Sequence, residues 1–76
     1  MPSAVVRRYA YRPELAALDI EFVSGRVYRY HSVPPDTGEE MRHWRSKGAF
    51  LNRKVRDRFA FERLRGWQEP EAPLEP

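Results

Sequence analysis

Two consecutive prolines, Pro34 and Pro35, divide this 76-residue chain into two parts with different hydrophobic periodicity. Before them, apolar residues alternate with polar ones, as in residues 18–22 (LDIEF), which is typical of strands with one buried face. After them, apolar residues recur at four-residue spacing from Leu51 to Phe59, which is typical of a helix. Neither proline can donate a hydrogen bond to a strand ladder, so the sheet should end there. We therefore expect an α+β fold with the strands first.

The alternating part predicts a three-stranded antiparallel meander, with strands over residues 5–11, 18–22 and 26–33. Pro35 suits the first turn of a helix, which should pack on the sheet and run to about Ser46. Gly48 would then stop this helix in a left-handed conformation. A second, short helix is predicted from Ala49 onward because of the four-residue apolar spacing.

Domain limits follow from length and composition. Residues 1–65 are expected to form one domain, since a chain of this size cannot supply two cores. Residues 66–76 contain three glutamates, a proline at every third position from Pro70 and no Lys or Arg, which predicts an extended acidic tail.

Hydropathy and cysteine content indicate the cellular compartment. No stretch approaches the ~20 apolar residues of a membrane span, and Arg7 and Arg8 interrupt the region where a signal peptide needs an apolar core. The chain has no cysteine, as expected for a protein of the reducing cytoplasm. We expect a cytoplasmic protein without membrane contact, and the sequence leaves its oligomeric state open.

Positive charge is concentrated in residues 41–65, which hold nine basic residues against two acids. Twelve of the 14 basic residues in the chain are arginine, the side chain that binds phosphate in a bidentate manner. This pattern predicts a nucleic-acid contact, although a solvated helix face rich in arginine would look similar. The predicted contact residues are Lys47, Gly48, Asn52, Arg53, Lys54, Arg56 and Arg58. Gly48 is among them because its backbone amide could join an anion site at a helix start. Asn52 could equally serve to cap or bridge backbone groups.

Catalytic residues are poorly represented. His31 and His43 lie on different predicted elements, and no spacing suits a metal or a nucleophilic triad. The acidic pair Asp19 and Glu21 is explained by an exposed strand face. We predict no catalytic residues, no metal and no cofactor, and therefore no enzyme.

Tyr28 and Tyr30 lie two apart and so share one face of the third predicted strand. A two-residue turn at Ser24-Gly25 would place both rings on the open face, where they could stack on bases. A three-residue loop over 23–25, with Gly25 in a left-handed bulge position, would place them in the core. Serine tolerates positive φ poorly, so we favour the bulged loop and a mainly structural role for both tyrosines.

Two sequence motifs carry a family resemblance: residues 27–34 (VYRYHSVP) and residues 46–57 (SKGAFLNRKVRD). Through them, the chain from Ser3 to about Arg63 resembles the KTSC domain. This domain is a small bacterial module also found at the C-terminus of some lysyl-tRNA synthetases. Pro35, Gly38 and Trp44 depart from the usual pattern of that family. The resemblance implies a small domain, and the synthetase context implies binding to RNA.

The sequence is compatible with two functions. We expect a non-catalytic module that binds RNA, or another polyanion, through its basic second helix. The alternative is a protein-interaction module that uses a free sheet edge or an aromatic surface. Binding that weakens steeply with salt would favour the first, because phosphate contacts release counterions.

Overall fold

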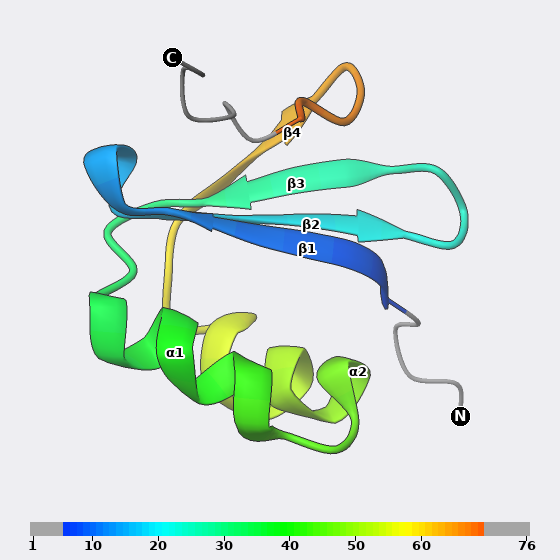
Figure 1. The fold of residues 1–76 in the computed structure, drawn as a ribbon. Coiled ribbons are helices and arrows are strands. Elements are labelled where there is room, and N and C mark those ends of the chain that lie inside the picture. Colours follow the sequence, from blue (N-terminus) through cyan, green and yellow to red (C-terminus); the bar gives the residue numbers. More distant parts are fainter. Residues whose placement is uncertain (1–5, 70–76) are drawn as a thin grey trace, which may run out of the picture.

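The computed structural model describes residues 6–69 and confirms an α+β fold in which helices cover one face of an antiparallel sheet (Figure 1). The sheet has four strands in sequence order, and α1 and α2 lie beneath it. A 3-10 turn, Pro13–Leu15, joins the first two strands, and a π-helical turn, Leu51–Val55, continues α2. The bounds of the remaining elements are β1 Val6–Arg12, β2 Ala17–Phe22, β3 Val27–Tyr30, α1 Pro35–His43, α2 Lys47–Phe50 and β4 Phe61–Leu64.

The fourth strand corrects the prediction of a three-stranded meander. β4 pairs antiparallel with β3, so that Phe61 lies opposite Tyr30 and Leu64 opposite Val27. It is only four residues long and largely exposed, and its partner lies more than 30 positions earlier in the chain. A short strand of this kind leaves almost no local periodicity, because its formation depends on a distant edge.

The β2–β3 hairpin has the favoured bulged loop. Phe22 N–H donates to Arg26 O at 2.9 Å, Gly25 N–H donates to Phe22 O at 2.8 Å, and Gly25 has a φ of 96°. Only glycine adopts this left-handed conformation without strain. In the resulting register, Ile20 pairs with Tyr28, so the tyrosines share the face of the apolar β2 residues.

The core lies between the sheet and the helices. Its buried members come from β2, β3, both helical segments and the turn before α1: Leu18, Ile20, Tyr30, Val33, Met41, Phe50, Leu51 and Val55. Of the apolar positions predicted from periodicity, Leu18, Ile20, Leu51 and Val55 are buried, whereas Phe22 and Phe59 are partly buried and pack against this cluster.

The helix boundaries differ from the predicted ones. α1 ends at His43 rather than near Ser46, and α2 begins at Lys47 rather than Ala49. Ser46 is the N-cap of α2, and its Oγ accepts a hydrogen bond from Ala49 N–H at 3.1 Å. Gly48 consequently lies inside the second helix and does not terminate the first one.

Candidate nucleic-acid interface

The basic residues between α1 and β4 belong to three local structures: the connection that holds Arg45, the second helix, and the turn after it. We call residues 47–55 the second helix and residues 45–58 the basic segment. Burial of Phe50, Leu51 and Val55 fixes one side of this helix against the core. The opposite side therefore faces solvent and carries the charged residues.

Lys47 is a structural residue, which contradicts its predicted role as a phosphate contact. Its ammonium donates to Met41 O at 2.7 Å, Trp44 O at 2.9 Å and Arg42 O at 3.2 Å. These are carbonyls at the C-terminal end of α1, where a cation is favourable to the helix dipole. All three donors of the ammonium are used in this way, so Lys47 caps α1.

Gly48 also fails as an anion-binding residue. It is buried in the first turn of the second helix, which leaves it no open approach for a ligand. The side chain of Ser46 already accepts the Ala49 amide at this helix start. The predicted amide site is therefore closed by the local structure.

Two more predicted contacts are partly engaged. Asn52 Oδ1 accepts a hydrogen bond from Arg56 Nη1 at 3.2 Å, which makes Asn52 a bridge to a neighbouring side chain. Lys54 Nζ lies 3.6 Å from a carboxylate oxygen of Glu40 on α1. The partner of Arg56 is neutral and supplies no counter-charge, whereas Lys54 has a carboxylate partner.

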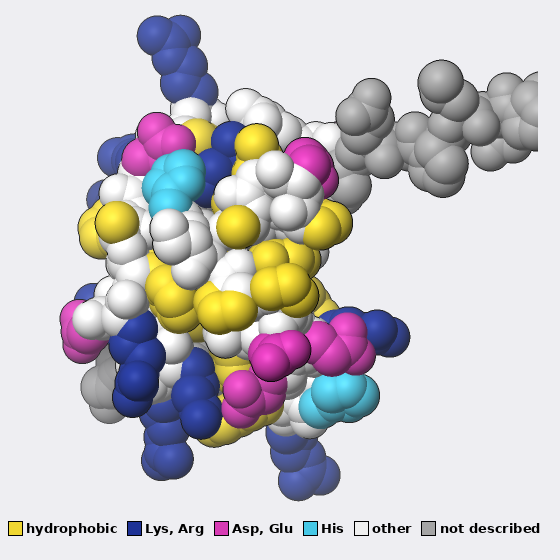
Figure 2. All heavy atoms as spheres, turned by 90° about the vertical axis from the view of Figure 1, so that its left-hand side faces the viewer, with side chains coloured by type: hydrophobic (Ala, Val, Ile, Leu, Met, Phe, Trp, Pro, Cys, Tyr) yellow, Lys and Arg dark blue, Asp and Glu magenta, His cyan; other side chains and the backbone are white. Residues whose placement is uncertain are grey.

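The remaining guanidinium groups are open to solvent. Arg53, Arg56 and Arg58 are exposed, as is Arg45, which the sequence did not single out among the contact residues. Within residues 6–69, no acidic side chain forms an ion pair with Arg45, Arg53 or Arg58. Figure 2 shows Lys and Arg side chains projecting from the lower, helical end of the molecule, with acidic side chains to one side of them.

Tyr30 and Tyr28 differ in burial. Tyr30 is 3% exposed, and its burial raises the pKa of the phenol above its ordinary value, so the hydroxyl is neutral. Tyr28 is half-buried, and its ring contacts Phe22 and Phe61 edge-on at centroid distances of 5.6 and 5.3 Å. Both rings lie on the helix-side face of the sheet, in agreement with a structural role.

The other face of the sheet, which we call the outer face, holds a buried ion cluster. Asp19, expected on an exposed strand face, is fully buried. Its carboxylate accepts from Arg12 Nε at 2.7 Å and from Arg29 Nε at 2.8 Å. Burial raises the pKa of Asp19, but the hydrogen bonds and charges of Arg29 and Arg12 outweigh it, so the pKa is lowered.

Residues 66–69, which we call the strap, cover this cluster. Gln68 accepts from Arg12 through its backbone carbonyl and from Arg29 through Oε1 at 3.2 Å. Arg8 pairs with Glu69 at 3.2 Å and lies 4.6 Å from the centroid of the Trp67 ring. The first four residues of the predicted acidic tail thus pack on the sheet, and residues 70–76 lie outside the described part of the chain.

We expect a chain that ends after Arg65 to lose about 1–3 kcal/mol of unfolding free energy, because its buried arginines would lose the acceptors that Gln68 supplies. Thermal or urea unfolding measures this loss. A chain that ends after Glu69 keeps the strap contacts and is the control. Equal stability of the two truncated chains would show that the strap does not stabilise the sheet.

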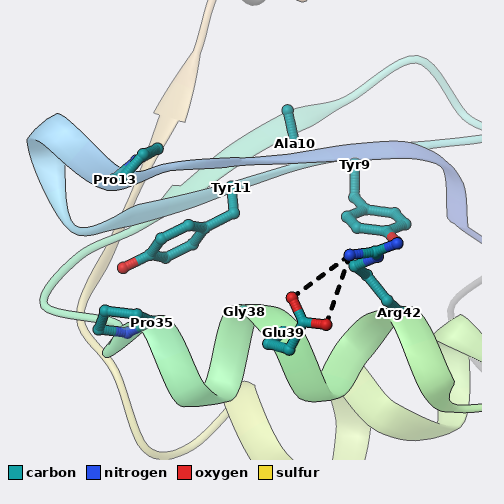
Figure 3. Close-up of a pocket in the computed structure, with 8 residues that line it drawn as sticks. All are labelled: Tyr9, Ala10, Tyr11, Pro13, Pro35, Gly38, Glu39 and Arg42. Carbon is teal, nitrogen blue, oxygen red and sulfur yellow. Dashed lines mark hydrogen bonds and ion pairs between the residues drawn. The ribbon is translucent and has the colours of Figure 1, made fainter.

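A groove of about 560 Å³ lies on the other side of the molecule, between β1 and α1. Figure 3 shows Tyr9 and Tyr11 pointing from β1 toward α1, with the Glu39–Arg42 ion pair below Tyr9. Gly38 permits this close approach, because a Cβ there would lie 2.7 Å from the Tyr11 ring. The residues that line the groove are Tyr9, Ala10, Tyr11, Pro13, Pro35, Gly38, Glu39 and Arg42.

β1 is an edge strand of the sheet, and its outer edge runs beside the groove. Phe22 N–H points toward β3, so by strand alternation Asp19 and Glu21 bond to β1. Their partners are Ala10 and Arg8, which leaves the backbone groups of Tyr9 and Tyr11 directed outward. Such an edge can pair with an extended peptide.

Residues 6–69 hold no group of three His, Cys, Asp or Glu side chains arranged to bind a metal ion. None of the helices described is long and apolar enough to cross a bilayer.

The fold and these surfaces define a small α+β module with a four-stranded antiparallel sheet, one face of which is covered by two helices. A family model for the KTSC domain matches residues 2–59. The chain therefore belongs to the KTSC domain family, as its sequence motifs indicated.

Three known proteins illustrate the relationship. The chain is 38% identical over 61 residues to a lysine–tRNA ligase of Nostoc punctiforme, an alignment that covers 80% of this chain and 11% of the ligase. It is 36% identical over 52 residues to an uncharacterised protein of Stutzerimonas stutzeri, covering 68% of this chain and 73% of that protein. The crystal structure of a KTSC domain protein from Yersinia pestis superposes with a TM-score of 0.76 at 23% identity, covering 84% and 90% of the two chains. The chain thus spans only about a tenth of the ligase.

Proposed function

We propose that this chain is a non-catalytic module that binds RNA through the exposed arginines of its basic segment. The observation that carries the proposal is the set of four exposed guanidinium groups, Arg45, Arg53, Arg56 and Arg58, whose charges no acidic side chain among residues 6–69 neutralises. Arg7, Arg26, Arg63 and Arg65 are also exposed and without an ion pair among these residues, but they are spread over β1, the β2–β3 hairpin, and β4 and the residue after it, whereas the four arginines of the basic segment fall within fourteen consecutive residues. An unpaired cluster favours a polyanionic partner that supplies the missing charge.

RNA is favoured over other polyanions by the relatives. Two relatives from Nostoc are lysine–tRNA ligases, and they carry a segment related to this chain. A small module within such an enzyme fits a role in holding the nucleic acid. We extend that role to this chain.

The proposal predicts a defined salt dependence. If about four phosphates are neutralised on a single strand, the logarithm of the association constant should fall with the logarithm of salt concentration with a slope of about −3. An Arg45→Ala, Arg53→Ala, Arg58→Ala triple variant should reduce the magnitude of this slope by roughly 2 and should still fold, because these side chains make no ion pair among the described residues. Fluorescence anisotropy of a labelled RNA oligonucleotide at several salt concentrations measures both quantities.

A matched control removes the same charge elsewhere. Arg7, Arg26 and Arg65 are exposed and lie on β1, in the β2–β3 hairpin and after β4. Their triple alanine variant should bind RNA with a slope close to that of the parent chain. Equal slopes for the parent and the basic-segment variant would rule out this surface.

The second candidate function is a protein-interaction module, and the free edge of β1 beside the groove supports it. A peptide that adds a strand there would bind through the outward backbone groups of Tyr9 and Tyr11. Such binding would persist at high salt, because main-chain hydrogen bonds release few ions. A partner retained at high salt would favour this function over RNA binding.

A further inference from the structure

The helix-side face of the sheet is not fully covered by the helices. Phe61, the first residue of β4, is 55% exposed although it begins a strand on this face. Its ring lies 5.3 Å from the Tyr28 ring and 5.5 Å from the Tyr30 ring, measured between centroids. We call Phe22, Tyr28 and Phe61 the aromatic strip, since their rings contact one another in sequence across β2, β3 and β4.

Arginines lie near the Phe61 end of this strip. Arg63 lies two residues after Phe61 on β4, so it shares the same face, and it is the register partner of Tyr28. Arg56 and the neighbouring Asp57 both lie close enough to the Tyr30 hydroxyl to act on its pKa, in opposite directions, and Phe61 packs against the Tyr30 ring. Phe61 therefore lies next to the exposed Arg63 on the sheet and contacts Tyr30, beside which Arg56 of the basic segment lies.

An exposed phenylalanine near arginines suits a ligand that combines a flat apolar ring with a phosphate. Nucleic-acid bases are such rings, and they stack on aromatic side chains only when they are released from pairing in a duplex. A protein partner would gain from the apolar ring but would need acidic groups to match Arg56 and Arg63. Charge complementarity along a continuous strand therefore favours nucleic acid here.

We propose that the aromatic strip binds an unpaired nucleotide of a single-stranded RNA segment, with the base stacked on Phe61 and flanking phosphates near Arg56 and Arg63. This inference rests on the proposed function and specifies it, because the basic segment alone would also bind duplex RNA. Phe61 lies beyond residues 2–59, which match the family model, so the strip depends on a strand outside the matched region.

The test compares a single-stranded oligonucleotide with a duplex of the same length, using the full chain. Phe61→Leu keeps an apolar side chain but removes the aromatic ring, and it should bind the single strand at least about fivefold more weakly, the lower end of what one stacked base contributes. Duplex affinity and the salt slope should not change. Phe61→Tyr should restore the affinity for the single strand.

Leu15→Ala is the matched control, because Leu15 is another exposed apolar residue and lies in the turn between β1 and β2. It should bind like the parent chain, and thermal unfolding should show that all variants are folded. Steep salt dependence with equal single-strand affinity for the parent and Phe61→Leu would overturn the stacking inference and leave the proposed function intact. If the parent chain binds neither the single-stranded oligonucleotide nor the duplex, the proposed function itself is overturned.

Discussion

Replacing Asp19 by asparagine is expected to lower the unfolding free energy by about 3–5 kcal/mol, one of the largest effects of any single change in this chain. The carboxylate is fully buried and accepts hydrogen bonds from both Arg12 and Arg29. An asparagine of the same shape leaves two guanidinium charges on the sheet without their counter-charge, and its amide donors face other donors. Urea unfolding at neutral pH measures the loss.

The same carboxylate should make stability depend on pH. Because the pKa of Asp19 is lowered in the folded state, its stabilising contribution is present above the ordinary carboxyl pKa of 3.8 and is lost as the pH falls through the lower folded value. Asp19→Asn should remove this part of the acid dependence.

Glu21→Gln is the control for both measurements. It makes the same chemical change two residues along β2, where the partner, Arg8, has an exposed side chain. A loss below about 1 kcal/mol is expected there. If the two variants lose similar unfolding free energy, the buried ion cluster stabilises the fold no more than an exposed ion pair does.

Tyr30→Ala is expected to lower the unfolding free energy by about 3–5 kcal/mol, because it leaves a cavity in the centre of the core. Tyr30 is 3% exposed and belongs to the main cluster of buried residues, and its ring contacts Phe61 of β4. Tyr30→Phe retains the ring and should change stability by less than about 1 kcal/mol. Tyr28→Ala should be milder, because the Tyr28 ring is only half-buried.

Thermal unfolding of the three variants checks this order. A Tyr30→Ala chain that melts at the parent temperature would mean that the ring does not pack in the core in solution. A loss with Tyr30→Phe as large as that with Tyr30→Ala would instead assign the stabilisation to the hydroxyl.

The sequence predicted the fold where local chemistry decides it. The β2–β3 register followed from the preference of Gly25 for positive φ, and it correctly placed both tyrosines on the apolar face. The helix-forming part followed from the proline pair and the spacing of Leu51 and Val55. These features depend on neighbouring residues, so one sequence is enough to find them.

The errors occurred where distant residues decide the structure. The burial of Asp19 depends on the strap, and Gln68 follows it by about fifty positions. The role of Lys47 depends on how the chain turns back toward the carbonyls of α1. The net positive charge of the basic segment was visible in composition, but which arginines remain unpaired could be read only from the structure.

The strap also has a kinetic consequence. It joins β1 to the chain after β4, so its contacts link residues more than 50 positions apart, such as Arg12 with Gln68 and Arg8 with Glu69. Contacts of such long sequence separation close the largest loop in the domain, and they can form only once both edge strands are in place. Interactions that are absent from the folding transition state act on the rate of unfolding. The strap should therefore lengthen the lifetime of the folded sheet while leaving the speed at which it folds nearly unchanged.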